Sequence, residues 1–143
     1  MPVYAIKAEV SDPSARSWTF EKQKTMNGGK LIGTGDEIFV FASENEGGCG
    51  LIAMGVVTAA QAIPRQAGVE RQTPRVSITV KRTGPVRHRL GRSELKSFKA
   101  WNDGCPETEL NFKLYRQATN KIVGLSADAA AFLRRFFQER ERA

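Results

Sequence analysis

The residue types that carry most enzymatic chemistry do not occur in this sequence in usable groups. His88 is the only histidine, so neither a histidine-based triad nor a multi-histidine metal site is predicted. Gly33-Thr34-Gly35 is too short for a phosphate-binding loop, and no Gly-Lys-Ser or Gly-Lys-Thr follows it. The acidic pairs Asp36-Glu37 and Glu44/Glu46 are better explained by their positions, the first at the solvent-exposed start of a strand and the second in a loop. We therefore expect a protein that is not an enzyme and uses no metal or cofactor.

Two tryptophans offer a different chemistry, the stacking of an aromatic ring on a flat base. Trp18 and Trp101 each stand among polar or basic neighbours rather than in an apolar run, and stacking supplies affinity through the π-face of the base. A partly buried core position is the competing interpretation for either ring. The polar pair Arg116-Gln117 lies between two apolar segments, where it either points into a pocket or caps neighbouring backbone.

The positive charge of the chain is concentrated in its middle third. Of the net charge of +7, residues 65–99 supply all of the excess, with ten Lys or Arg against the two acids Glu70 and Glu94. A patch of one sign attracts polyanions by a term that depends on salt. The alternative is a solvated surface that keeps a small protein in solution. The segregation of charge favours contact with nucleic acid.

Length and composition indicate a single domain, residues 1–143, with a core of its own. No apolar run approaches the roughly 20 residues of a membrane helix, and the N-terminus enters a strand-like segment without a secretory signal. Cys49 and Cys105 lack CxxC spacing and are expected to be free thiols. These features predict a cytoplasmic location.

Hydrophobic patterning predicts a mixed α/β (α+β) fold made of short strands. Alternation is clearest in Arg75–Arg82, where Val76, Ile78 and Val80 are expected to face the core. Short helices are predicted from Ser17 and over Ser93–Trp101, and a final helix is predicted after the N-cap Ser126. The other strands are predicted at Val3–Ala8, Glu37–Ala42, Leu51–Ala59 and Lys121–Leu125, with a polar, glycine-rich loop joining the second and third of these.

Three segments resemble the EVE domain and its relatives in the PUA-like superfamily. They are residues 4–9 (YAIKAE), residues 35–41 (GDEIFVF) with residues 50–57 (GLIAMGVV), and residues 115–117 (YRQ) followed by residues 121–126 (KIVGLS). Residues 41–48 (FASENEGG) also look like the corresponding stretch of YTH domains. The resemblance implies a strongly curved, barrel-like sheet of five or six strands with surrounding helices. It also implies non-catalytic recognition of nucleic acid, often of a modified base held in an aromatic-lined pocket.

Site residues follow from the resemblance together with the charge pattern. The tryptophan-containing segment common in EVE domains is not recognisable here, and Trp18-Thr-Phe-Glu stands instead. A partner nucleic acid, RNA or DNA, would place its base in a pocket formed by Lys7, Trp18, Ser43, Asn45, Arg116 and Gln117, with Trp101 as a further wall. Its phosphates would contact Arg75, Lys81, Arg82, Arg87, Arg89 and Arg92. The alternative is a small-molecule or peptide binding module on the same fold, without affinity for nucleic acid.

Overall fold

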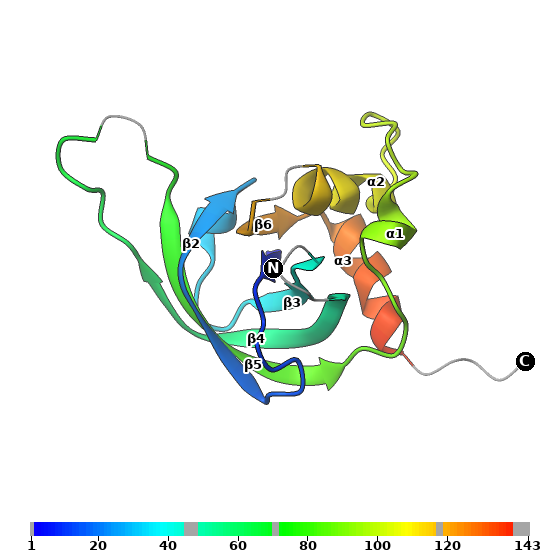
Figure 1. Ribbon diagram of the computed structural model, residues 1–143, viewed down its shortest axis with the longest axis horizontal. Helices are drawn as coiled ribbons and strands as arrows, with labels where there is room; N and C mark the ends of the chain where they lie inside the picture. Colours follow the sequence, from blue (N-terminus) through cyan, green and yellow to red (C-terminus); the bar gives the residue numbers. More distant parts are fainter. Residues whose placement is uncertain (1, 45–48, 70–71, 117–118, 139–143) are drawn as a thin grey trace, which may run out of the picture.

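Six strands of the described part of the chain close into a single barrel. The computed structural model describes residues 2–44, 49–69, 72–116 and 119–138 (Figure 1). Around the barrel the strands follow the order β1-β3-β4-β5-β2-β6. The β1–β3 and β2–β6 pairs are parallel, and the other pairs are antiparallel. The strands are β1 (Val3–Ala8), β2 (Ser17–Met26), β3 (Glu37–Ala42), β4 (Gly50–Ala62), β5 (Arg75–Pro85) and β6 (Lys121–Leu125).

Apolar side chains fill the barrel and also cover part of its outside. Ile6 belongs to the cluster inside the barrel, whereas its neighbour Ala5 belongs to a second cluster beneath the helices. Successive residues of a strand point to opposite faces, so β1 is buried on both sides, as its apolar sequence predicts. Phe39 and Phe41 of β3 are wholly buried in the outer cluster, and Val40 between them is buried in the inner one.

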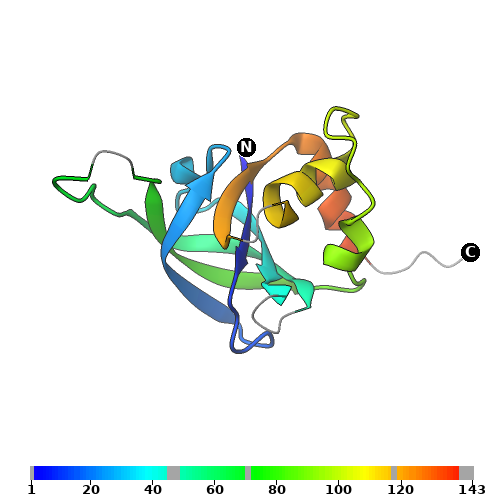
Figure 2. The same ribbon diagram turned by 45° about the horizontal axis from the view of Figure 1, so that its top comes forward.

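Helices gather over one side of the barrel. In Figures 1 and 2 the α-helices lie together on the side of β1, β3 and β6, whereas the helical turn at residues 29–31 lies apart from them, beside β2 and β6. The outward-reaching parts of β4 and β5 have no helix over them in the described chain. None of the described helices is long and apolar enough to cross a membrane. The helical segments are η1 (Gly29–Leu31), α1 (Arg92–Leu95), α2 (Pro106–Leu110), η3 (Asn111–Tyr115, a π-helical turn), α3 (Ala127–Arg134) and η4 (Arg135–Phe137).

The helix predicted from Ser17 was wrong, because this segment forms β2. Its residues pair with β5, from Ser17 opposite Lys81 to Lys24 opposite Arg75. This pairing satisfies backbone groups that a short helix would leave open at both ends. The helix predicted over Ser93–Trp101 is also shorter than expected and is limited to α1.

The final helix begins as predicted, and its cap is shared with α2. Ser126 Oγ accepts a hydrogen bond from the Ala129 amide at 3.1 Å and itself donates to Glu109. Glu109 also accepts from the Ser126 amide at 2.8 Å and from Lys113 Nζ at 3.0 Å. Burial acts to raise the pKa of Glu109, but these hydrogen bonds lower it overall. The ionised carboxylate therefore ties α2 to the start of α3.

Replacing Glu109 with glutamine is expected to reduce the free energy of unfolding at neutral pH by about 1–2 kcal/mol, since the charge-assisted bonds are lost. A lowered folded-state pKa contributes stability above the unfolded-state pKa, and this contribution disappears as pH falls through the folded-state pKa. The difference between wild type and Glu109→Gln should therefore shrink on acidification in pH-dependent urea denaturation. Glu21→Gln, at an exposed position of β2, should match wild type throughout. A difference independent of pH would contradict this role of the carboxylate.

Candidate functional site

Two buried lysines face each other across neighbouring strands at one end of the barrel. Lys7 of β1 is the register partner of Lys121 of β6, and their relative exposures are 1% and 2%. Alternation along β1 directs Lys7 to the same outer face as Ala5. Lysine is rarely fully buried, so two buried lysines side by side mark this end of the barrel. Lys121 Nζ donates to the carbonyl of Thr119 at 3.1 Å.

An aromatic ring from the helical layer covers Lys7. Tyr115 is the last residue of η3, and its ring centre lies 5.4 Å from Lys7 Nζ and 5.6 Å from the guanidinium carbon of Arg92. Tyr115 Oη donates to Glu44 Oε1 at 3.4 Å, and the same oxygen accepts from the Arg92 amide at 2.8 Å. Burial and the neighbouring Glu44 carboxylate raise the pKa of Tyr115, so the phenol keeps its proton.

Two polar atoms in this region have no hydrogen-bond partner in the described part of the chain. They are Lys7 Nζ and Ser43 Oγ, both buried. Ser43 follows the last residue of β3, and its amide donates to the carbonyl of Ala8 at 2.8 Å. Burial, reinforced by the charges of Lys121 and Arg92, lowers the pKa of Lys7 to about 8. Unpaired buried polar groups are costly and rare in folded proteins, so these two atoms identify the candidate site.

The structure brings some of the residues predicted for the base pocket together. Lys7 and Ser43 lie at the same end of β1 and β3, whereas Asn45 and Gln117 lie outside the described residues. Sequence reasoning missed Tyr115, although it immediately precedes the polar pair Arg116-Gln117. Its segment had no interpretable periodicity, because η3 is a π-helical turn that fits neither the helix nor the strand repeat. Glu44, Arg92 and Lys121 complete the group, which we call the Lys7–Tyr115 cluster.

Trp18 contacts a different part of the molecule. It is half-buried on β2, where it packs against the cluster inside the barrel. Its Nε1 donates to the carbonyl of Asp12 at 2.9 Å, and the guanidinium carbon of Arg82 lies 5.0 Å from the ring centre. Both of its polar and stacking contacts are thus made within the protein, and its proposed role as a cage wall stays a prediction.

Trp101 lies on the surface of the helical layer. Its side chain is 43% exposed, and its ring packs at 5.6 Å against the ring of Phe112, which is 39% exposed. The guanidinium carbon of Arg116 lies 5.3 Å from the Trp101 ring and 4.9 Å from that of Phe112. Arg116 thus stacks on an exposed aromatic pair. Arg116 and Lys121 also line the same small hollow.

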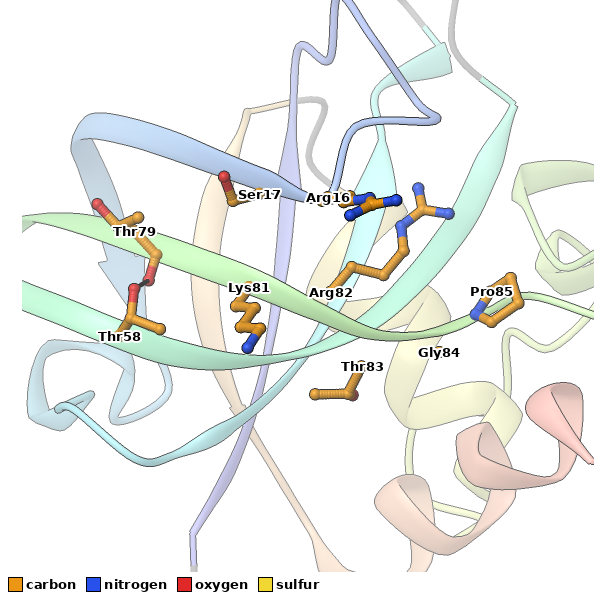
Figure 3. A pocket seen from close by; sticks show the side chains of 9 residues that line it. All are labelled: Arg16, Ser17, Thr58, Thr79, Lys81, Arg82, Thr83, Gly84 and Pro85. Carbon is orange, nitrogen blue, oxygen red and sulfur yellow. Dashed lines mark hydrogen bonds between the residues drawn. The ribbon is translucent and has the colours of Figure 1, made fainter.

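The six predicted phosphate contacts separate into three places. Arg75 lines a cleft beside β2, and Lys81 and Arg82 line a hollow of about 580 Å³ shown in Figure 3. Arg87 and Arg89 lie between β5 and α1, and Arg92 is the first residue of α1. Arg89 is 3.7 Å from Glu94, and Arg92 contacts the ring of Tyr115. Of these six residues, only Arg92 therefore belongs to the Lys7–Tyr115 cluster. No group of three or more His, Cys, Asp or Glu side chains suited to a metal ion occurs in the described ranges.

Solved structures share this fold at low sequence identity. The DUF55 domain of human thymocyte nuclear protein 1 is 14% identical, with a TM-score of 0.63 and coverage of 96% of this chain and 99% of that one. The human THYN1 protein in complex with DNA containing 5-methylcytosine gives the same identity and TM-score over 99% and 100% of the two chains. A hypothetical protein from Leishmania major is 15% identical, with a TM-score of 0.60 over 99% and 98%. No protein-family model and no curated protein matches the sequence. The likeness confirms the predicted fold, a strongly curved, barrel-like sheet with surrounding helices.

Proposed function

We propose that this protein is a non-catalytic nucleic-acid-binding domain that reads a modified base at the Lys7–Tyr115 cluster. The observation that carries the proposal is the pair of buried, unpartnered polar atoms, Lys7 Nζ and Ser43 Oγ, on one end of the barrel. A bound ligand would supply the hydrogen bonds that the described chain does not. The complex of the similarly folded human THYN1 protein with DNA containing 5-methylcytosine supports a nucleic acid as that ligand.

The chemistry of the cluster fits the edge of a base. The Lys7 ammonium offers only donors, and the Ser43 hydroxyl offers a donor and an acceptor. Base edges present both acceptors and amino donors, so this pair can discriminate between them. Tyr115 supplies an aromatic surface beside the donors. Glu44 accepts a hydrogen bond from Tyr115, and its charge favours the ammonium form of Lys7. Because the donors are buried, a base within a duplex would have to leave its stack to reach them.

Discrimination between a modified and a plain base should weaken when Ser43 is replaced. The test uses fluorescence anisotropy with two DNA oligonucleotides that differ by a single 5-methylcytosine. Wild type is expected to bind the methylated one more tightly. Ser43→Ala removes one neutral hydrogen bond, which is worth roughly 0.5–1.5 kcal/mol, and should reduce affinity for the methylated oligonucleotide by about 2–10-fold. Further modified bases, in DNA and RNA, extend the panel if methylcytosine gives no preference.

The matched control is Ser93→Ala, at an exposed serine outside the cluster, which should behave as wild type. Equal affinity of wild type for all modified and plain oligonucleotides would refute base reading at this site. An unchanged preference in Ser43→Ala would remove Ser43 from the reading group while leaving the rest of the cluster to be tested through Lys7.

A further inference from the structure

One face of the barrel displays cations and hydroxyls without a helix over it. Along β5, Val76, Ile78 and Val80 are buried while Arg75 and Lys81 are exposed, so alternation places Arg75, Ser77, Thr79 and Lys81 on the outer face. The pairing of β2 with β5 sets Lys24 beside Arg75 and Ser17 beside Lys81. Figure 1 shows this side of β2 and β5 turned away from the helical layer.

At one end of this face, five cations surround a cleft. Its volume is about 970 Å³, and its described lining contains no acidic residue. The cations come from segments far apart in the sequence: two from β2, one from η1 and two from the arm that joins β4 to β5 and the start of β5. They are Lys22, Lys24, Lys30, Arg65 and Arg75. Three of the five, those from β2 and η1, lie outside the basic segment 65–99. The fold therefore adds their charge to that of Arg65 and Arg75.

The backbone at Lys22 is held in a conformation that lysine rarely adopts. Its φ is 51°, in the left-handed region that favours glycine. Lys22 stands in a bulge of β2, where the register with β5 shifts between Phe20 and Gln23. Its amide donates to Ser77 Oγ at 2.9 Å, and its carbonyl accepts from Arg75 Nη1 at 2.8 Å. Bulges re-aim side chains, and this one directs Lys22 to the cleft lining. Glu21, also in the bulge, is exposed.

The other end of the face carries a second basic hollow, drawn in Figure 3. Arg16, Lys81 and Arg82 line it together with the hydroxyls of Ser17, Thr58, Thr79 and Thr83, and none of its described lining residues is acidic. Arg82 Nε is buried without a hydrogen-bond partner in the described chain. Guanidinium, ammonium and hydroxyl groups are the side-chain donors that contact phosphate oxygens in nucleic-acid complexes.

We propose that this face, from the Lys22 cleft to the Lys81 hollow, binds the phosphate backbone of a nucleic acid irrespective of sequence. The inference rests on the proposed function and adds a second surface to it. The six residue steps from Arg75 to Lys81 span about 20 Å at roughly 3.4 Å per residue. One strand of duplex DNA advances about 3.4 Å per phosphate, so the face matches about six nucleotides. Base reading at the Lys7–Tyr115 cluster and backbone binding here would then be separate tasks.

Binding of a short, unmodified DNA duplex, measured by fluorescence anisotropy over a series of salt concentrations, tests the proposal. The variant is Lys22→Gly with Lys24→Gln, since glycine suits the left-handed backbone at position 22 and keeps the bulge intact. Each lost phosphate contact lowers the slope of log affinity against log salt by about 0.9. In the double variant the magnitude of this slope should therefore fall by nearly two. The variant should bind plain DNA about 10-fold more weakly at low salt, and its melting temperature should be no lower than that of wild type. Lys81→Gln should produce a further loss of about one in the slope.

Lys96→Gln with Lys99→Gln is the matched control, because it removes the same charge from exposed positions near α1. An unchanged slope in the Lys22/Lys24 variant, or an equal loss in the control, would overturn the proposal. Absence of DNA binding in wild type, with an acidic protein retained instead, would also overturn it. The ratio of affinities for methylated and plain DNA should stay at the wild-type value in the Lys22/Lys24 variant. Equal affinity of wild type for every modified and plain oligonucleotide would refute base reading at the Lys7–Tyr115 cluster, whereas the loss of salt slope in the Lys22/Lys24 variant reports on this face.

Discussion

Replacing Lys7 with methionine is expected to make the protein more stable and at the same time a weaker nucleic-acid binder. The ammonium of Lys7 is buried without a hydrogen-bond partner in the described chain, and burial lowers its pKa from 10.5 to about 8. Each pKa unit corresponds to about 1.4 kcal/mol, so holding Lys7 charged costs the folded state about 3 kcal/mol at neutral pH. Methionine has a similar length and no charge, so it should recover most of this free energy.

The gain in stability should depend on pH in a defined direction. A lysine whose folded-state pKa is lowered destabilises the protein fully below the folded-state value, here about 8. The cost fades as pH rises towards the unfolded-state value of about 10.4, because Lys7 is then neutral in both states. The difference in free energy of unfolding between Lys7→Met and wild type should therefore be largest below pH 8 and shrink above it. Urea denaturation at a series of pH values measures this difference.

Binding should change in the opposite sense. A hydrogen bond from a charged donor is worth roughly 1.5–3 kcal/mol, so Lys7→Met should bind the preferred modified oligonucleotide about 10–100-fold more weakly. Lys96→Met, at an exposed position, removes the same charge and should change neither stability nor the preference for a modified base. A variant that loses stability, or that binds as well as wild type, would show that Lys7 serves the core and not a ligand.

The second large effect is expected at Gly50, the first residue of β4. Its φ is +87°, and an added Cβ would collide with the carbonyl oxygen of Leu90 and lie 2.7 Å from Gly91 Cα. Both neighbours are backbone, and the Leu51 amide donates to the same carbonyl at 2.8 Å, so this segment has little freedom to move away. Left-handed strain of about 1–2 kcal/mol and crowding of about 1–3 kcal/mol add. Gly50→Ala should therefore lower the free energy of unfolding by about 2–5 kcal/mol.

Gly35→Ala separates the two contributions. Gly35 also has a positive φ, +94°, but no described atom lies within 4 Å of the position of an added Cβ. It should therefore lose only the backbone term, about 1–2 kcal/mol, in the same denaturation experiment. Gly50→Ala should also weaken ligand binding, because the displaced segment carries Arg92, whose amide donates to Glu44. Equal losses in the two variants would show that Gly50 is not in tight contact with residues 90–91.

The sequence by itself determined most of the strands and the start of the last helix. Val76, Ile78 and Val80 were identified by period-two alternation, and Ser126 by its position before an apolar helical stripe; the structure confirms both. Such patterns depend on neighbours two to four residues away. The misplaced helix at Ser17 shows their limit, because pairing with β5 decides the conformation of that segment and local propensity does not.

Only the tertiary structure decided which residues form each surface. Lys7 and Ser43 were anticipated through the family resemblance. Closure of the barrel makes Lys121 the register partner of Lys7, and the docking of η3 places the ring of Tyr115 over Lys7. Barrel closure likewise divided the basic middle third and joined Lys22 and Lys24 of β2 to Arg75. Strand order and register set these distances, and neither leaves a local trace in the chain. The sequence therefore showed which groups were available, and the closed barrel showed which of them meet.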